Sequence, residues 1–176
     1  MDMVGIMLHN IDTRVCAEYS KHVSIDAINS AMQDAISFLN PTNDNLTISI
    51  LITDNKNIAQ LNQSFRGIPE STDVLSFPPE GISHEEPGVT ELEADQLGDI
   101  VISYEEIERQ STKYRQSREE VLNFLLIHGL LHLSGYDHAT PEEQSLMQHK
   151  ESDILNQLNI PNNIVYKMYE AHGLEG

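Results

Sequence analysis

The chain has 176 residues, of which 39% are hydrophobic, and its formal net charge at pH 7 is −18. This length suits a single domain with a substantial hydrophobic core. The negative charge argues against a protein that coats nucleic acid or anionic membranes by bulk attraction, although a local basic groove is compatible with it. The lone cysteine, Cys16, excludes an intramolecular disulfide. No apolar run approaches the ~20 residues that span a bilayer, so we expect a cytoplasmic protein without membrane association.

The first half of the chain alternates between strand-like and helix-like patterns. A first strand is predicted at residues 3–9, and residues 10–22 lack a clear pattern. Apolar residues at helical spacing predict a helix over 24–39, and alternating β-branched residues predict a strand over 46–53. A second helix is expected over about 55–65. Its inward face would consist of Ile58, Leu61 and Phe65.

The second half contains two further strands and a series of helices. Short strands are predicted at 74–77 and 97–103, separated by an acidic loop over 80–96. Helices are predicted at about 104–115, 117–134 and 141–158. We therefore expect one α+β domain spanning residues 1–176, in which a small mixed β-sheet packs with about five helices.

The most informative segment is His128-Gly-Leu-Leu-His132-Leu-Ser-Gly135-Tyr-Asp-His138. On a helix, His128 and His132 lie one turn apart on the same face. Gly135 can end the helix in a left-handed conformation, so that the chain returns and brings His138 to the same place. Three histidines can hold a zinc ion, and the open fourth position for water is typical of a catalytic site.

A histidine pair at this spacing is also common on exposed helices that bind no metal. Here the preceding residues 121–127 are largely apolar, which predicts a buried helix. Because buried histidines without partners are costly, a shared metal ion is the simpler interpretation. Zinc proteases of the H-E-x-x-H type carry a glutamate general base after the first histidine, but Gly129 occupies that position here. The base of a peptidase is therefore absent from the motif.

Other polar residues have two interpretations each. Arg66 stands at a predicted helix end, where it can either grip a phosphate or interact with solvent and the helix dipole. Asp137 can orient a histidine ligand or remain a solvated turn residue. Residues 109–118 hold four of the ten positive charges, and they form either a local basic patch or a solvated face that balances nearby glutamates.

Four blocks together resemble the YbeY family, the bacterial rRNA maturation endoribonucleases. They are Leu61-Asn-Gln-Ser-Phe-Arg-Gly67, Ser71-Thr-Asp-Val-Leu-Ser-Phe-Pro78, Leu97-Gly-Asp-Ile-Val-Ile-Ser103 and the histidine block 128–138. The resemblance extends from about residue 46 to residue 158. It implies an α+β domain with one zinc ion per chain at the end of a central helix, held by His128, His132 and His138. It also implies that Arg66 matches a functionally important arginine of the family.

The resemblance further implies an activity on single-stranded RNA, in maturation of the 3′ end of 16S rRNA in the small ribosomal subunit and in ribosome quality control. Our hypothesis is zinc-assisted phosphodiester hydrolysis with catalytic roles for Arg66, His128 and His132. Activated water would either attack phosphorus or act as a base on the 2′-hydroxyl. Alternatives are a non-enzymatic ribosome-assembly factor with a structural zinc and a metal hydrolase of another substrate class. The sequence leaves the oligomeric state open.

Overall fold

The computed structural model describes residues 8–40, 42–79 and 95–172. Its strands are β1 (Asn10–Val15), β2 (Thr47–Thr53), β3 (Val74–Phe77) and β4 (Gln96–Ser103). Its helices are η1 (Ala17–Tyr19, a 3₁₀ turn), α1 (Ile25–Leu39), α2 (Asn55–Arg66), α4 (Tyr104–Tyr114), α5 (Arg118–Leu133), α6 (Pro141–Gln157) and α7 (Asn163–His172).

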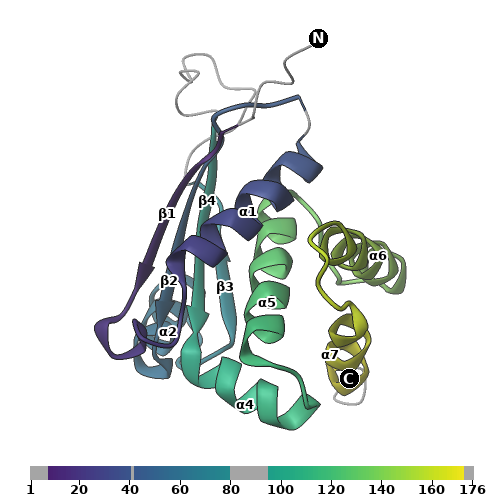
Figure 1. The fold of residues 1–176 in the computed structure, drawn as a ribbon. Coiled ribbons are helices and arrows are strands. Elements are labelled where there is room, and N and C mark those ends of the chain that lie inside the picture. The colour runs from purple at the N-terminus through teal and green to yellow at the C-terminus, as the bar shows by residue number, and fades with distance from the viewer. Residues whose placement is uncertain (1–7, 41, 80–94, 173–176) are drawn as a thin grey trace.

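The strands form one mixed sheet in the order β1-β2-β4-β3. The pairs β1/β2 and β2/β4 are parallel, and β3 runs antiparallel to β4 at the edge. Helices α1 and α5 cover one face of the sheet, and α6 and α7 pack outside α5 (Figure 1). The α+β class with a small mixed sheet is therefore confirmed.

Strand alternation divides the core between the two faces of the sheet. The larger cluster joins isoleucines of β2 and β4, such as Ile50 and Ile100, to α1 and α5. The smaller cluster, on the α2 side, contains Ile58, Leu75 and Val101. Residues on α5 are buried along nearly the whole helix, from Val121 onward, which agrees with the apolar run before the first histidine. The histidine-bearing helix is thus the central helix of the domain.

Side-chain caps place the ends of the helices that carry the site. Ser117 and Glu120 form a reciprocal capping box at the start of α5, and Thr140 and Glu143 form another at the start of α6. Each box satisfies backbone N–H groups that have no partner within the first turn. Pro141 occupies the first turn of α6, where its fixed φ favours helix initiation. Six residues, 134–139, connect the end of α5 at Leu133 to Thr140, the N-cap of α6. The connection that carries His138 is therefore short.

Two predictions about individual elements were wrong. The first strand that the structure describes is β1 at Asn10–Val15; residues 8–9 of the strand expected at 3–9 are not in a strand, and residues 3–7 lie outside the described residues. Residues 10–22 showed no clear pattern, but residues 10–15 form β1, an edge strand in which only Ile11 and Val15 are apolar and the buried position between them is Thr13. Phe65 was expected to face inward, yet at the last turn of α2 it is 59% exposed, and its ring packs against Phe77 at the end of β3 with centroids 4.9 Å apart.

The C-terminal part adds a helix that the sequence patterns did not predict. α7 packs against α5 and α6 through Ile164, Val165 and Met168, which are all buried. It raises the number of α-helices among the described residues to six, against about five expected. The predicted acidic loop lies outside the described residues from position 80 to 94. Within the parts that the structure describes, no helix combines the length and apolarity needed to cross a membrane.

Candidate metal centre

Helix α5 presents His128 and His132 on one face, as the four-residue spacing predicts. Their ring centroids are 4.7 Å apart, and the two Nε2 atoms are 3.2 Å apart. The last turns of α5 continue to Leu133, and the backbone N–H of Ser134 bonds back to Leu130 and Leu131. The pair is therefore held on a regular, buried helix, which limits how far the two rings can move relative to one another.

His138 returns to the same place through a tight turn. Gly135 has φ +92°, a conformation that glycine adopts without strain. The backbone N–H of Tyr136 then bonds to the carbonyl oxygen of Leu131, and the Asp137 carboxylate accepts the backbone N–H of His138 at 2.8 Å. The His138 ring lies 5.3 Å from His128 and 5.0 Å from His132 between centroids. The structure thus brings the three predicted ligands together.

The geometry of the three rings fits a single metal ion. One ligand nitrogen from each of the three histidines lies within 4.8 Å of the others. Zinc–nitrogen bonds of about 2.0–2.1 Å place two tetrahedral ligands about 3.3 Å apart, close to the separation between His128 and His132. Burial, and then the neighbouring His128 and His138, lower the pKa of His132 to about 4. Its ring is neutral at pH 7, which is the form that binds a metal.

The histidines open into a cavity of about 760 Å³. Arg66, from the end of α2, lines the same cavity together with Thr72, Asp73 and Tyr169. Arg66 is exposed, and α2 ends directly after it because Gly67 takes a left-handed conformation with φ +72°. An arginine and a set of metal-ligand nitrogens therefore border one solvent-accessible space, although they are more than 60 residues apart in sequence.

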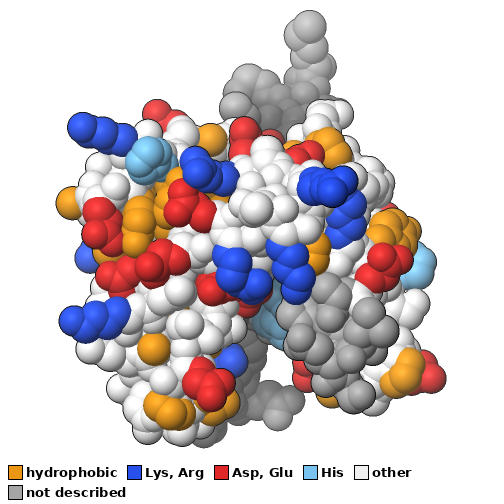
Figure 2. Space-filling model, turned by 90° about the horizontal axis from the view of Figure 1, so that it is seen from below, with side chains coloured by type: hydrophobic (Ala, Val, Ile, Leu, Met, Phe, Trp, Pro, Cys, Tyr) orange, Lys and Arg blue, Asp and Glu red, His pale blue; other side chains and the backbone are white. Residues whose placement is uncertain are grey.

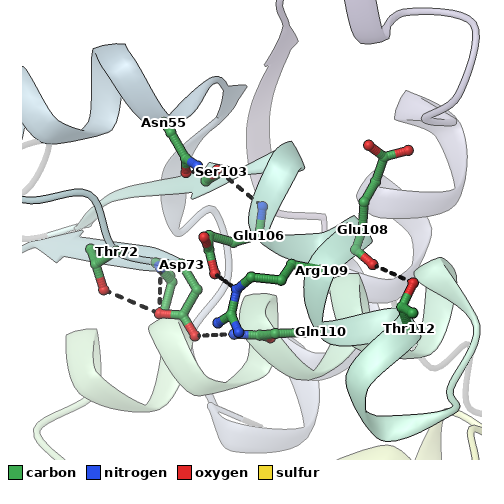
Figure 3. Close-up of polar contacts among 10 residues, drawn as sticks. Asn55, Thr72, Asp73, Ser103, Glu106, Glu108, Arg109, Gln110 and Thr112 are labelled. Atoms are coloured by element: carbon green, nitrogen blue, oxygen red, sulfur yellow. Dashed lines mark hydrogen bonds and ion pairs between the residues drawn. The ribbon is translucent and has the colours of Figure 1, made fainter.

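Asp73 holds the wall of this cavity in place. Its Oδ1 accepts the backbone N–H of Val74 at 2.8 Å, and its Oδ2 accepts Gln110 Nε2 at 2.8 Å (Figure 3). Gln110 is 2% exposed, so this bond ties the start of β3 to the interior of α4. The backbone carbonyl of Asp73 also accepts the N–H of Ser103 at the end of β4. Asp73 is thereby a structural link, extending the local turn bond expected of an aspartate before a strand.

Comparison with known proteins identifies the family of this chain. A family model described as "Endoribonuclease YbeY" matches residues 14–159. The chain belongs to the YbeY family. A Clostridioides difficile protein named Endoribonuclease YbeY is 46% identical over 117 residues, covering 66% of this chain and 74% of the relative. A Caldanaerobacter subterraneus subsp. tengcongensis protein of the same name is 35% identical over 161 residues, covering 89% and 99% respectively.

The YbeY assignment agrees with a solved structure at the level of the fold. The solution structure of TM1509 from Thermotoga maritima aligns with a TM-score of 0.56, covering 96% of each chain, at 19% sequence identity. At this identity the likeness shows a shared fold. The arrangement of sheet and helices described above is thus found in an experimentally determined protein.

The glycine in the YbeY histidine motif has a packing reason. A Cβ atom on Gly129 would lie 3.1 Å from two side-chain carbons of Ile100 and 3.2 Å from Ser76 Oγ. Position 129 thus faces the sheet, and Ser76 Oγ donates to its carbonyl oxygen at 3.3 Å. A glutamate at this position would point into the strands and not toward the histidines. The absence of the H-E-x-x-H base follows from the way α5 packs on β3 and β4.

The basic segment 109–118 is partly neutralised. Arg109 pairs with Glu106 at 2.7 Å, and Arg118 pairs with Glu108 at 2.9 Å. Figure 2 shows Lys and Arg side chains on this lower face interspersed with Asp and Glu, around a recess in which histidine is visible. Two of the four cations thus balance nearby glutamates, as one of the two interpretations of the sequence predicts.

Sequence reasoning missed a carboxylate beside the YbeY histidines. Glu151 in α6 is 0% exposed, and its Oε1 lies 2.8 Å from His128 Nδ1. The sequence contained a signal, because Glu151 occupies the apolar stripe formed by Met147, Ile154 and Leu155. A charged residue on the buried face of a helix must have a partner. Of the two interpretations of Asp137, the turn residue agrees with the structure, because its carboxylate accepts the backbone N–H of His138.

Proposed function

We propose that this chain is a zinc-dependent endoribonuclease that cleaves single-stranded RNA in the cytoplasm, acting on small-subunit ribosomal RNA. Its specific task would be maturation of the 3′ end of 16S rRNA, with a role in ribosome quality control. The observation that carries the proposal is the shared cavity, in which His128, His132 and His138 face the same space as Arg66. The relatives named Endoribonuclease YbeY support the reaction class.

The three histidines would hold one zinc ion per chain. Their neutral imidazole nitrogens are suitable donors for zinc, and three protein ligands leave a position open to solvent. When bound, zinc would lower the pKa of a coordinated water toward ~7 and polarise a phosphoryl oxygen. His128 and His132 count as catalytic because they would hold the ion directly beside the scissile phosphate.

Arg66 would bind the phosphate that is cleaved. A guanidinium is always charged and can donate two parallel hydrogen bonds to phosphoryl oxygens. Negative charge increases on these oxygens as the phosphodiester reacts, so a cation at this position stabilises the transition state more than the ground state. Arg66 belongs to α2, whereas His128 and His132 belong to α5. Loss of Arg66 is therefore expected to spare the metal site.

The principal rival is a ribosome-assembly factor in which zinc only stabilises the fold. A structural zinc site is usually closed by four protein ligands, and Asp137, which also lines the cavity, is the nearest acid in the motif that could be a fourth. Its Oδ1 instead accepts the N–H of His138, and the three ligands border a large cavity. Both observations favour an open, catalytic site. A metal peptidase is disfavoured by the packing of position 129 against the sheet.

The decisive experiment compares the zinc-loaded protein with His132→Ala, purified in parallel, on a short single-stranded RNA and its duplex. We expect the wild-type protein alone to cleave the single strand, and to leave the duplex largely intact. Equal cleavage by both proteins would indicate a contaminating nuclease and would contradict the assignment.

The same pair of proteins is then tested on small ribosomal subunits that carry unprocessed 16S rRNA. Primer extension or sequencing of the 3′ end reports cleavage at single-nucleotide resolution. Processing by the wild-type protein and not by His132→Ala is the expected result. If neither free RNA nor the ribosomal particle is cleaved, the assembly-factor alternative replaces the enzymatic one.

A further inference from the structure

A buried acid and a tyrosine adjoin the three histidines, and the tyrosine also lines the cavity. Glu151 Oε1 accepts a hydrogen bond from Tyr169 Oη–H at 3.2 Å in addition to its contact with His128 Nδ1 at 2.8 Å. The two residues come from α6 and α7, which pack against each other and against α5. Three helices therefore meet at one carboxylate oxygen.

The fold alone gives no reason for an acid at this position. The side chain of Glu151 is 0% exposed, and its Oε2 has no hydrogen-bond partner among the described residues. Burying a carboxylate costs several kcal/mol unless it is fully paired, and an apolar residue of similar volume is often more stabilising. The neighbouring positions Met147, Ile154 and Leu155 are apolar and equally buried. The carboxylate is therefore best explained by its contact with His128.

The contact determines which nitrogen of His128 can bind a metal. A carboxylate accepts hydrogen bonds, so His128 Nδ1 carries the proton and Nε2 keeps its lone pair. Nε2 is the atom that lies 3.2 Å from His132 Nε2. Burial, and then Glu151, raise the pKa of Tyr169, so its hydroxyl stays protonated and donates. The chain Tyr169–Glu151–His128 thus directs one lone pair toward the other two histidines.

We propose that Glu151 is a positioning residue of the metal centre: it fixes the tautomer and orientation of His128 and makes its Nε2 a stronger donor, while Tyr169 holds the carboxylate in place. Glu151 is 0% exposed, so it acts through His128 and not on RNA directly. Carboxylates that accept the second N–H of a ligand histidine typically contribute 10–100-fold to metal affinity. The inference rests on the zinc site of the proposed function, and it is independent of RNA cleavage.

The test is the zinc dissociation constant of Glu151→Gln, measured by competition with a chromophoric chelator at pH 7 without RNA. Glutamine preserves the size of the side chain and one acceptor oxygen but removes the charge. We expect about a 10–100-fold weaker zinc affinity and a smaller weakening for Tyr169→Phe, which removes one donor to the carboxylate. Glu142→Gln is the matched control, because Glu142 is an exposed acid on the same helix, and its zinc affinity should equal that of the wild type.

The stability of the metal-free variants distinguishes positioning from packing. If Glu151 serves only the fold, urea unfolding without metal will change while the zinc affinity stays within twofold of the wild type, and the proposal is overturned. A second readout needs no substitution. Nitrogen-15 NMR of the metal-free wild-type protein should show His128 in the Nδ1–H form, and an Nε2–H form would contradict the proposal even if Glu151→Gln failed to fold.

The outcomes separate this inference from the proposed function. Equal zinc affinity in wild type and Glu151→Gln, together with RNA cleavage by the wild type, refutes the role of Glu151 alone. Weakened zinc affinity in the variant, without RNA cleavage by the wild type on any substrate, supports Glu151 and refutes the nuclease. A wild-type protein that binds no zinc refutes both.

Discussion

At the scale of single residues, the candidate metal centre combines an exposed arginine with a half-buried histidine. Arg66 is exposed at the end of α2, whereas His132 is half-buried on α5 and its pKa is lowered to about 4. A solvated cation can meet an incoming phosphate without first losing its own partners, and a neutral imidazole can donate its lone pair. Each residue thus has the protonation state that its proposed role requires at neutral pH.

Replacing Arg66 by alanine should lower turnover of single-stranded RNA by about two to three decades, the scale for removing one electrostatic stabiliser. Because Arg66 is exposed and belongs to another element than the histidines, zinc content should remain one ion per chain. Single-turnover kinetics and metal analysis of the same sample measure both quantities. Arg66→Lys is the control, since it keeps the charge and loses the two-pronged geometry, and its rate should be intermediate. Loss of zinc from Arg66→Ala would refute the assigned role.

The metal-free protein should become less stable as the pH falls from about 6.5 to about 4. His132 has a folded-state pKa of about 4, below its value of ~6.5 in the unfolded chain. The unfolded state therefore binds more protons between these values, and the free energy of unfolding falls as the pH is lowered through this window. We expect a loss of about 1–2 kcal/mol, less than the full shift implies because solvent partly screens the ring.

Urea unfolding in EDTA at several pH values measures this dependence. His132→Gln should show a shallower decline over the same window, because glutamine does not titrate. An equal decline in both proteins would show that other groups dominate the acid sensitivity.

At the scale of elements, the wall of the cavity depends on how the edge strand β3 joins β4. The β2/β4 register shifts between Thr47 and Ile48, and Gly98 lies at this irregularity with φ +123°. A Cβ atom there would overlap the carbonyl oxygen of Phe77 and would approach Leu133 Cδ2 to 3.0 Å. Glycine at this position thus permits close contact between β4, the end of β3 and the end of the histidine-bearing helix.

Gly98→Ala should destabilise the protein by about 3 kcal/mol, because it adds a steric overlap to a backbone conformation that costs 1–3 kcal/mol for other residues. Gly67→Ala is the matched control. Gly67 also has positive φ, but its Cβ would meet nothing within 4 Å, so a loss of about 1 kcal/mol is expected. Urea denaturation gives both values. Equal losses would show that the overlap at Gly98 is relieved by a small shift of β3.

At the scale of the whole molecule, the net charge of −18 opposes the binding of RNA. The ion pairs of Arg109 and Arg118 with glutamates reduce the local positive field further. Attraction must therefore come from a few cations around the recess in Figure 2, among acidic side chains. A ribosomal particle that presents the RNA strand would compensate for the weak attraction, since it raises the local concentration of substrate.

Affinity for free single-stranded RNA should accordingly be weak and should fall with salt. Fluorescence anisotropy between about 50 and 200 mM salt measures the slope of log affinity against log salt concentration. Arg66→Ala should reduce that slope by about 0.7, the value for one contact to a single strand. Tight binding that is insensitive to salt would contradict a phosphate-based mode of recognition.

Local patterns in the sequence determined much of this protein. The spacing of His128 and His132 and the turn at Gly135 depend on residues within a few positions of one another, and both are found in the structure as predicted. The mixed α+β architecture also follows, because apolar periodicity distinguishes helices from strands. The edge strand β1 escaped prediction because it is short and its buried position is a threonine, Thr13, between only two apolar residues, and α7 was not predicted after Pro161.

Tertiary structure decided the features that depend on distant segments. Glu151 meets His128 only because α6 packs on α5, and Arg66 reaches the histidine cavity only because α2 ends beside the edge strand β3. Phe65 was expected in the core, but its ring packs on Phe77 at the end of the edge strand β3 and stays 59% exposed. The physical reason is common to all three: periodicity tells which face of an element is apolar, whereas the partner of a side chain is set by the packing of elements far apart in the chain.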